Sequence, residues 1–221
     1  NNLKDYEYYS VPRTNRSGGG VGVFLRKGFK VLQNENLSFS SMEYIDLVVS
    51  HGSSSMRLLT IYRPPCSKKN RATPAMFFKD FSNLLETLAI TPGPLILCGD
   101  FNFHMDSATD HNACMFRDIL ESAGLHQHVN VPTHRSSHTL DLIIDRNENN
   151  MLSGFSTCCD LPSDHFAVTC TVVFAKPKAT KTLFRHRPLR NIDICKFKSD
   201  LMNSELYSEL PSSPDKLVDL Y

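Results

Sequence analysis

Between residues 18 and 174 the chain alternates between two hydrophobic patterns, and this alternation constrains its fold more than any other feature. Short apolar runs rich in β-branched residues predict strands, which cover residues 21–26, 44–50, 57–62, 95–98, 139–144 and 166–174. The loop at residues 52–55 joins the second and third of these runs. It predicts a hairpin of consecutive antiparallel strands.

Two segments between these strands have helical spacing. Thr73 and Pro74 suit the N-cap and first turn of a helix, and one apolar stripe follows them, formed by Phe77, Phe81, Leu84, Leu85 and Leu88. A second helix is predicted at residues 113–123, with Gly124 as its C-terminal stop. Helices mixed with hairpin-type strands predict an α/β fold in which helices cover the outer faces of β-sheets.

The composition excludes several classes of protein. Of the 221 residues 41% are hydrophobic, which is enough for a packed core and argues against a disordered chain. A net charge of +1 excludes a strongly basic nucleic-acid coat or an acidic tail protein, although a local basic patch is compatible with it. No stretch approaches the roughly 18 consecutive apolar residues of a membrane span, so we expect a soluble protein without a membrane partner.

The cysteines indicate a reducing compartment. There are seven, an odd number, and none forms a Cys-x-x-Cys pair. This pattern favours free, partly buried thiols over a disulfide framework or a zinc knuckle. We therefore expect an intracellular protein.

The composition changes after Phe174. Basic residues crowd a stretch in which Asp193 is the only acid, and they are Lys176, Lys178, Lys181, Arg185, Arg187, Arg190, Lys196 and Lys198. A helix is predicted to begin near Asp193. We therefore divide the chain into a domain at residues 1–175 and a basic, partly helical linker at residues 176–221. The alternative is a solvated connector that binds nothing. The chain begins with Asn1 rather than Met, which suggests a piece of a longer protein.

The first candidate site follows the strand at residues 95–98. That strand ends in Gly99, and Asp100 and Asn102 come next. Ligand sites favour the ends of buried strands, and period-two geometry places these two side chains on one side. A carboxylate beside a donating amide suits the orientation of a water molecule and contact with an anionic oxygen. The alternative is a turn capped by Asp100, with Asn102 in a left-handed conformation.

A second candidate is Asp141, which lies inside an otherwise apolar strand. A carboxylate is costly there unless it is paired or hydrogen-bonded. A histidine is a suitable partner, because a buried carboxylate fixes the imidazole tautomer. The alternative is an edge strand with Asp141 facing solvent.

Two further pairs of polar residues lie next to strands. Asp164 and His165 precede the last strand, where Asp164 suits a hard cation such as Mg²⁺ and His165 suits a phosphate oxygen. A surface turn is the alternative. Tyr62 and Arg63 end an earlier strand, and both side chains suit contact with phosphate. The alternative for Tyr62 is a ring at the edge of the core.

Five segments, taken in order, resemble the motifs of the endonuclease/exonuclease/phosphatase superfamily. They are GGGVGV at 18–23, IYRPP at 61–65, CGDFN at 98–102, PTH at 132–134 with HTLDLII at 138–144, and SDHFAV at 163–168. Within the superfamily, the sequence is most similar to the apurinic-type endonuclease domain of LINE-type (non-LTR) retrotransposons, over residues 6–174. The segment LRNID at 189–193 resembles the connector that such elements place before their reverse transcriptase.

The resemblance implies a DNase I-like, four-layer α/β/β/α sandwich of two packed mixed sheets, here lacking its first strands, which hydrolyses phosphodiesters with Mg²⁺ or Mn²⁺. It implies catalytic roles for Asp100, Asn102, Asp141, His165 and Tyr62. Asp100 would activate the attacking water and Asn102 would contact that water or the scissile phosphate. Asp141 would orient His165, which would stabilise charge on the phosphate, and Tyr62 would touch the phosphate.

The resemblance also implies ligands and partners. It places Asp164 beside the metal ion and Thr133 on the DNA backbone, and we add Arg63 and Ser163 as nucleic-acid contacts. In LINE elements such a domain nicks chromosomal DNA, and the freed 3′ hydroxyl primes reverse transcription. The implied partners are therefore DNA and a reverse transcriptase domain, and the implied location is the nucleus.

The sequence departs from the family pattern at its start. The family has an asparagine on its first strand and a metal-binding glutamate well upstream of the glycine-rich turn, whereas only 17 residues precede Gly18. Glu7 and Glu43 do not match that glutamate and are predicted to be surface charges. We therefore expect weak Mg²⁺ binding and weak or no nicking by this chain. The alternatives are a phosphatase or phosphodiesterase of the same superfamily, or a non-catalytic remnant that binds nucleic acid.

Overall fold

The structure of the chain is a computed structural model that describes residues 3–13, 19–35, 37–67, 71–91, 93–146, 151–174 and 192–204. The chain divides into two compact units, Asn1–Ala179 and Thr180–Tyr221. All of the predicted site residues belong to the first unit. The basic run at residues 176–190 lies outside the described residues.

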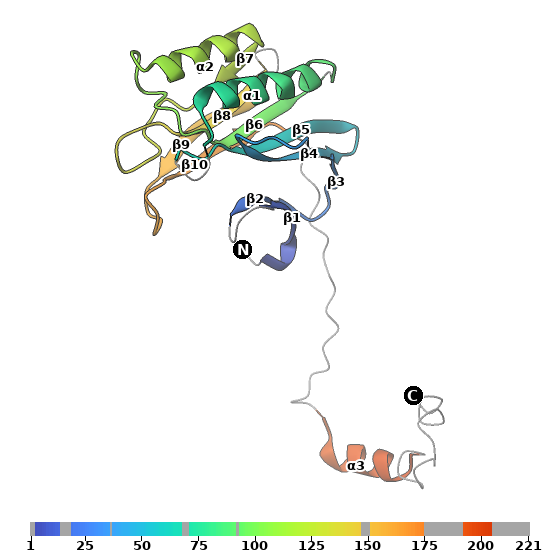
Figure 1. Ribbon diagram of the computed structural model, residues 1–221. Coiled ribbons are helices and arrows are strands. Elements are labelled where there is room, and N and C mark those ends of the chain that lie inside the picture. The colour runs from blue at the N-terminus through green and yellow to red at the C-terminus, as the bar shows by residue number, and fades with distance from the viewer. Residues whose placement is uncertain are drawn as a thin grey trace. The chain divides into compact units, whose positions relative to one another are not determined.

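A six-stranded sheet forms the centre of the first unit (Figure 1). In spatial order its strands are β3 (Lys30–Gln33), β4 (Glu43–His51), β5 (Ser54–Tyr62), β6 (Leu95–Asp100), β8 (Asp141–Arg146) and β7 (Leu125–Gln127). The pair β5–β6 is parallel and the other pairs are antiparallel. The predicted hairpin is confirmed as β4–β5, with Gly52 in the left-handed region at φ +60° in its turn.

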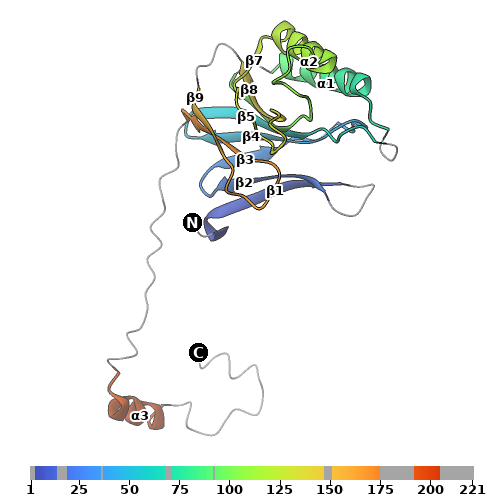
Figure 2. The same ribbon diagram turned by 90° about the vertical axis from the view of Figure 1, so that its left-hand side faces the viewer.

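Helices α1 (Pro74–Ala89) and α2 (His111–Ser122) cover one face of this sheet (Figure 2). Thr73 is the N-cap of α1, as predicted, and its side chain accepts a hydrogen bond from the Met76 N–H at 3.3 Å. Asp110 caps α2 in the same way, accepting from the Ala113 N–H at 2.8 Å. The second helix therefore begins two residues before the predicted start.

An aromatic cluster fills the space between the helices and the sheet. Phe77, Phe81, Phe101 and Phe116 are all fully buried. The rings of Phe77 and Phe81 stack with centroids 5.4 Å apart, and those of Phe101 and Phe116 are tilted with centroids 5.2 Å apart. Because Phe101 follows β6 directly, this cluster also anchors the segment that carries Asn102.

Two small sheets lie on the opposite face of the six-stranded sheet (Figure 2). One pairs β1 (Tyr6–Pro12) with β2 (Gly20–Arg26), and the other pairs β9 (Leu152–Cys158) with β10 (Ala167–Val172). The first packs on the β4 side chains of Ile45, Leu47 and Val49, and the second packs on Ile96 and Ile143. The predicted α/β fold of packed sheets with helices outside is thus confirmed. In the described part of the first unit both α-helices lie over the six-stranded sheet.

The predicted strands are present, and four others escaped the sequence patterns. Strands β3 and β7 are short, and β9 contains serine and glycine at exposed positions, so none has a strong apolar alternation. Strand β1 has only partly buried apolar positions. Strand β8 begins at Asp141 instead of residue 139, because the Leu140 N–H donates to the Thr133 side chain rather than to a neighbouring strand.

The described part of the second unit contains helix α3 (Ile194–Met202). The Asp193 side chain caps it by accepting from the N–H groups of Cys195 and Lys196, both at 3.0 Å, which confirms the predicted start. All seven cysteines of the chain are free thiols. Among the described residues no helix has the length and apolar character needed to cross a membrane.

Candidate active site

Three of the predicted site residues lie side by side at the ends of adjacent strands. Tyr62 of β5 is the register partner of Asp100 of β6, and Asp100 is the partner of Asp141 of β8. Their neighbours Ile61 and Leu142 point into the helical core, so the three polar side chains point to the other face. The register of the sheet therefore produces a row of one phenol and two carboxylates.

Asp100 and Asn102 are joined by two hydrogen bonds. The Asn102 N–H donates to Asp100 Oδ1 at 3.0 Å, and the Asn102 side-chain amide donates to Oδ2 at 2.8 Å. The same amide donates to the Arg63 carbonyl at 2.9 Å. Asn102 has φ +52°, the left-handed conformation that was the alternative interpretation of this segment. The strand ends at Asp100, and a local turn, rather than strand geometry, brings the amide to the carboxylate.

Asp141 is paired with a histidine. The Nδ1 atom of His165 lies 2.8 Å from Asp141 Oδ2, and both side chains are half-buried. Burial acts to lower the pKa of His165, but the hydrogen bond and charge of Asp141, with the charges of Asp100 and Asp164, outweigh it and leave the pKa raised. The surroundings of His165 therefore stabilise the imidazolium form relative to that of a free histidine.

The carboxyl group of Asp100 has a raised pKa. Burial is the main cause, and the negative charge of Asp141 adds to it, so that the pKa of Asp100 rises to about 6. The hydrogen bonds from Asn102 and the charge of His165 oppose this rise. A carboxylate with a pKa near neutrality is well suited to accept and release a proton.

We expect a carboxyl-detected NMR titration to show one aspartate with a pKa near 6, and Asp141→Asn to lower that pKa because it removes the neighbouring charge. The native state holds this proton to higher pH than the unfolded chain. The contribution of Asp100 to the free energy of unfolding is therefore fully present below its ordinary pKa of 3.8 and is lost as the pH rises to about 6. An unchanged titration in the Asp141→Asn variant would contradict the assignment.

The predicted nucleic-acid contact of Arg63 is wrong. The residue is only 5% exposed, and its guanidinium donates to the carbonyls of Phe101 and Asn102 at 3.2 and 3.1 Å. The guanidinium also lies 4.0 Å from the centre of the Phe103 ring. Arg63 therefore supports the turn that positions Asn102, and it is enclosed by the aromatic cluster instead of facing a phosphate.

The predicted backbone contact of Thr133 with DNA is also wrong. Thr133 is fully buried, and its hydroxyl accepts hydrogen bonds from the N–H groups of Leu140 and Asp141 at 2.9 and 3.0 Å. Those two N–H groups lie at the start of β8, where no neighbouring strand accepts a hydrogen bond from them. Thr133 thus fixes the backbone that carries Asp141.

Thr133→Val should lower the free energy of unfolding by about 1–3 kcal/mol, because it leaves two buried N–H groups without their acceptor. Thr133→Ser keeps the hydroxyl and should cost markedly less. Urea denaturation followed by circular dichroism measures both. Equal stability of the valine and serine variants would count against this structural role.

The other predicted residues lie around the Asp100–Asp141–His165 cluster. The Ser163 hydroxyl accepts from the His165 N–H at 3.1 Å and is exposed. Asp164 has a side chain that is 69% exposed, and a hydrogen bond from His134 lowers its pKa. The pKa of Tyr62 is raised, first by burial and then by the charge of Asp100.

Two residues near the site were missed. Glu43, predicted to be a surface charge, is the register partner of Tyr62 and forms an ion pair with Arg13, whose guanidinium lies 5.9 Å from the Tyr62 ring centre. His134 pairs with Asp164 at 3.3 Å, and its ring meets the His165 ring edge to face, with centroids 4.8 Å apart. Only the position of His134 next to Thr133 in the PTH motif hinted at this placement.

Two groups of residues in the described part of the chain offer donors to a metal ion. In the first, one donor atom each of Asp100, Asp141 and His165 lies within 4.8 Å of the others, and in the second the same holds for His134, Asp164 and His165. The two carboxylates of the first group fit Mg²⁺ or Mn²⁺, which prefer oxygen ligands and retained water. The predicted metal ligand Asp164 belongs to the second group.

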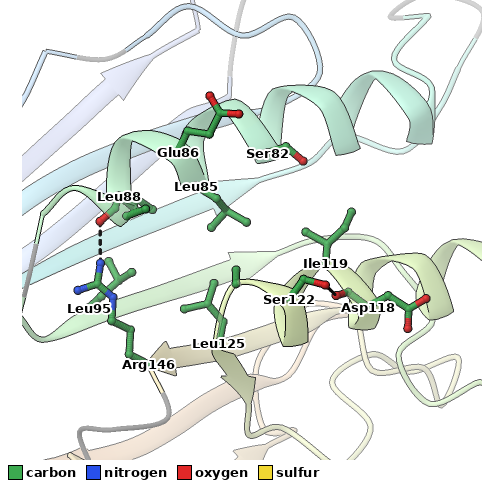
Figure 3. Close-up of a pocket in the computed structure, with 12 residues that line it drawn as sticks. Ser82, Leu85, Glu86, Leu88, Leu95, Asp118, Ile119, Ser122, Leu125 and Arg146 are labelled. Atoms are coloured by element: carbon green, nitrogen blue, oxygen red, sulfur yellow. Dashed lines mark hydrogen bonds between the residues drawn. The ribbon is translucent and has the colours of Figure 1, made fainter.

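A groove of about 650 Å³ lies elsewhere, on the helical face between α1 and α2 (Figure 3). Leu85, Ile119 and Leu125 point into it, and Arg146 reaches across its end to donate to the Leu88 carbonyl at 2.7 Å. None of the predicted site residues lines this groove. The chemistry therefore has to be sought on the opposite face of the sheet.

The model of the Endonuclease/Exonuclease/phosphatase family matches residues 1–191 of the chain. No curated protein sequence matches it.

Several solved structures have the same fold. The endonuclease domain of TRAS1, a telomere-specific non-LTR retrotransposon, has a TM-score of 0.63 at 15% identity, over 78% of this chain and 82% of that one. D. rerio TDP2 complexed with a single-strand DNA product has a TM-score of 0.53 at 15% identity, with 76% and 77% covered. The human Nocturnin catalytic domain with a bound sulfate anion has a TM-score of 0.51 at 18% identity, with 78% and 73% covered.

Proposed function

The chain belongs to the endonuclease/exonuclease/phosphatase family, and we propose that it is a metal-dependent endonuclease that nicks DNA as part of a non-LTR retrotransposon polyprotein. The observation that carries this proposal is the hydrogen-bonded Asp141–His165 pair next to the hydrogen-bonded Asp100–Asn102 pair, with donor atoms of Asp100, Asp141 and His165 within 4.8 Å of one another. Together they offer a proton acceptor, an amide and a cationic donor within one cluster. Such a combination can activate a water molecule and stabilise the charge that develops on a phosphodiester during hydrolysis.

In this proposal Asp100 takes the proton of the attacking water, for which its pKa of about 6 is well placed. The Asn102 amide holds the carboxylate in position through its bond to Oδ2. His165 donates from its other ring nitrogen, Nε2, to a phosphate oxygen, because Nδ1 is occupied by Asp141. Its raised pKa favours the charged form, which stabilises negative charge on the phosphate.

Enzymes of this family generally depend on a divalent metal ion, and we propose Mg²⁺, with Mn²⁺ as a substitute. Asp141 would hold it, and Asp164 is a candidate ligand from the second group, while Asp100 stays free to act as the base. When bound, the ion supplies positive charge that offsets the charge developing on the phosphate oxygens. Tyr62, next to Asp100 in the sheet, is placed to contact the same phosphate.

The choice of DNA as substrate is supported by two of the structural neighbours, a retrotransposon endonuclease domain and a protein complexed with single-strand DNA. The basic residues after Phe174 are consistent with a connector to a reverse transcriptase domain. We propose that the polyprotein acts in the nucleus, where its DNA target lies. Ser163, exposed beside His165, is the remaining candidate for a contact with the DNA backbone.

The test is the conversion of supercoiled plasmid to the open circle with Mg²⁺ and with EDTA, beside release of phosphate from a soluble phosphate monoester. We expect slow nicking that requires the metal and no release of phosphate. Release of phosphate without nicking would replace the proposal with a phosphatase, and DNA binding without either reaction would indicate a non-catalytic remnant.

A further inference from the structure

We propose that His134, Asp164 and His165 form a second metal site, which takes a first-row transition ion such as Zn²⁺ in preference to Mg²⁺. One donor atom of each residue lies within 4.8 Å of the other two. The three side chains come from two segments that are 30 residues apart in the sequence. The proposal for binding stands on this geometry alone and does not require the proposed nuclease function.

The backbone holds the two segments together before any ion binds. His134 and His165 form an isolated antiparallel bridge. The Phe166 N–H donates to the Thr133 carbonyl at 2.7 Å, and the Arg135 N–H donates to the Asp164 carbonyl at 2.8 Å. Because these bonds flank both histidines, the donors are preorganised, and little ordering remains to oppose the binding of an ion.

Each histidine has a partner on Nδ1, which leaves Nε2 for an ion. His165 Nδ1 is bonded to the Asp141 carboxylate at 2.8 Å, an arrangement that raises the basicity of a metal-binding imidazole. His134 Nδ1 faces Ser136, with the N–H at 3.1 Å and Oγ at 2.5 Å. Without an ion, the Nε2 proton of His134 is shared with Asp164 at 3.3 Å. When an ion binds Nε2, the proton moves to Nδ1, where Ser136 Oγ accepts it in place of the hydrogen bond that the Ser136 N–H donates to Nδ1 without an ion.

The donor set decides which ion is preferred. Two imidazole nitrogens and one carboxylate oxygen suit Zn²⁺ and other first-row transition ions, and an open position remains for water. Mg²⁺ prefers oxygen ligands, and the group with Asp100 and Asp141 offers two carboxylates where this group offers one. The neighbouring groups thus differ in the ions they select, although they share His165.

The shared histidine couples the two sites. An ion bound to His165 Nε2 occupies the nitrogen that the proposed function directs to the phosphate. Zn²⁺ should therefore inhibit Mg²⁺-dependent nicking, and the inhibition should require His134. This consequence depends on the proposed function, whereas the binding itself is measured without any substrate.

The test is titration of the 221-residue chain with Zn²⁺ by calorimetry, and with Co²⁺ by visible absorption, in the presence of a non-chelating reductant. We expect one Zn²⁺ for each chain, and affinity at least tenfold lower in His134→Gln. The matched control is His126→Gln, an exposed histidine on β7, which should leave the affinity unchanged. Asp164→Asn is a second test variant. Because the Asp164 side chain is 69% exposed, its replacement should not unfold the chain, and a change in Zn²⁺ affinity can be assigned to the lost ligand.

Zn²⁺ affinity that stays the same in both His134→Gln and Asp164→Asn overturns the proposal. The proposal is also overturned if the affinity for Zn²⁺ is lost when the adjacent exposed thiols Cys158 and Cys159 are replaced with serine. If Zn²⁺ binds as expected but no nicking is found, the proposed function fails and the metal site stands. If nicking is found and Zn²⁺ inhibits the native chain and His134→Gln equally, the coupling is refuted.

Discussion

Replacing Asp100 with asparagine should lower the rate of metal-dependent plasmid nicking by about 10³-fold, within the range expected for loss of a general base. The asparagine has nearly the same shape and keeps a contact with Asn102, but it cannot take a proton from water. It also removes the carboxylate whose pKa lies near 6. The measurement is single-turnover nicking of supercoiled plasmid by the native chain and by the variant.

The matched control for this variant is Asp118→Asn. Asp118 is exposed on α2, on the face of the sheet opposite to the site, so its replacement should leave the rate unchanged. Asp100→Asn should be about as stable as the native chain at pH 7, because the loss of one of the two hydrogen bonds from Asn102 is offset by removal of a buried carboxyl whose ionisation opposes folding. A rate within threefold of the native value would exclude Asp100 as the base. If the variant is less stable than the native chain, its lower rate of nicking would be due to impaired folding instead.

Gly99→Ala should lower the free energy of unfolding by about 4 kcal/mol, the sum of backbone strain and overpacking. Gly99 has φ +136°, and an added Cβ atom would lie 1.9 Å from the Ile61 carbonyl oxygen of β5. That atom belongs to the backbone and cannot rotate away. To accept the methyl group, β6 has to move from β5, which also displaces Asp100 from Tyr62.

Gly93→Ala is the control that separates the two causes. Gly93 has φ +108°, but an added Cβ atom would meet nothing within 4 Å. We expect a loss of about 1 kcal/mol from backbone strain alone. Urea denaturation of both variants gives the comparison. Equal losses would show that the close approach of β5 to Gly99 is of no consequence for stability.

Local patterns predicted the parts of the fold that depend on short segments. The stripe from Phe77 to Leu88, with Thr73 as its cap, is a property of neighbouring residues, and α1 has those bounds to within a residue or two. The same holds for the hairpin β4–β5 and for the cap of α3 at Asp193. The edge strands β3 and β7 were missed because three or four residues are too few to show a period.

The candidate site was predicted in part. The structure brings together four predicted residues, Asp100, Asn102, Asp141 and His165. They could be predicted because polar residues at the ends of apolar strands stand out in the sequence. The direction of each polar side chain near those ends was not visible. Arg63 and Thr133 are as polar as the others, but they turn inward and bond to backbone.

Spacing along the chain was enough to place six of the strands, both helices of the first unit and the polar residues at the strand ends. The shared register of Tyr62, Asp100 and Asp141, the position of Glu43 and Arg13 beside them, and the contact of His134 with His165 became apparent only in the folded chain. Register and burial arise from packing between segments distant in the sequence, and a small shift of one strand would turn each of these side chains to the other face.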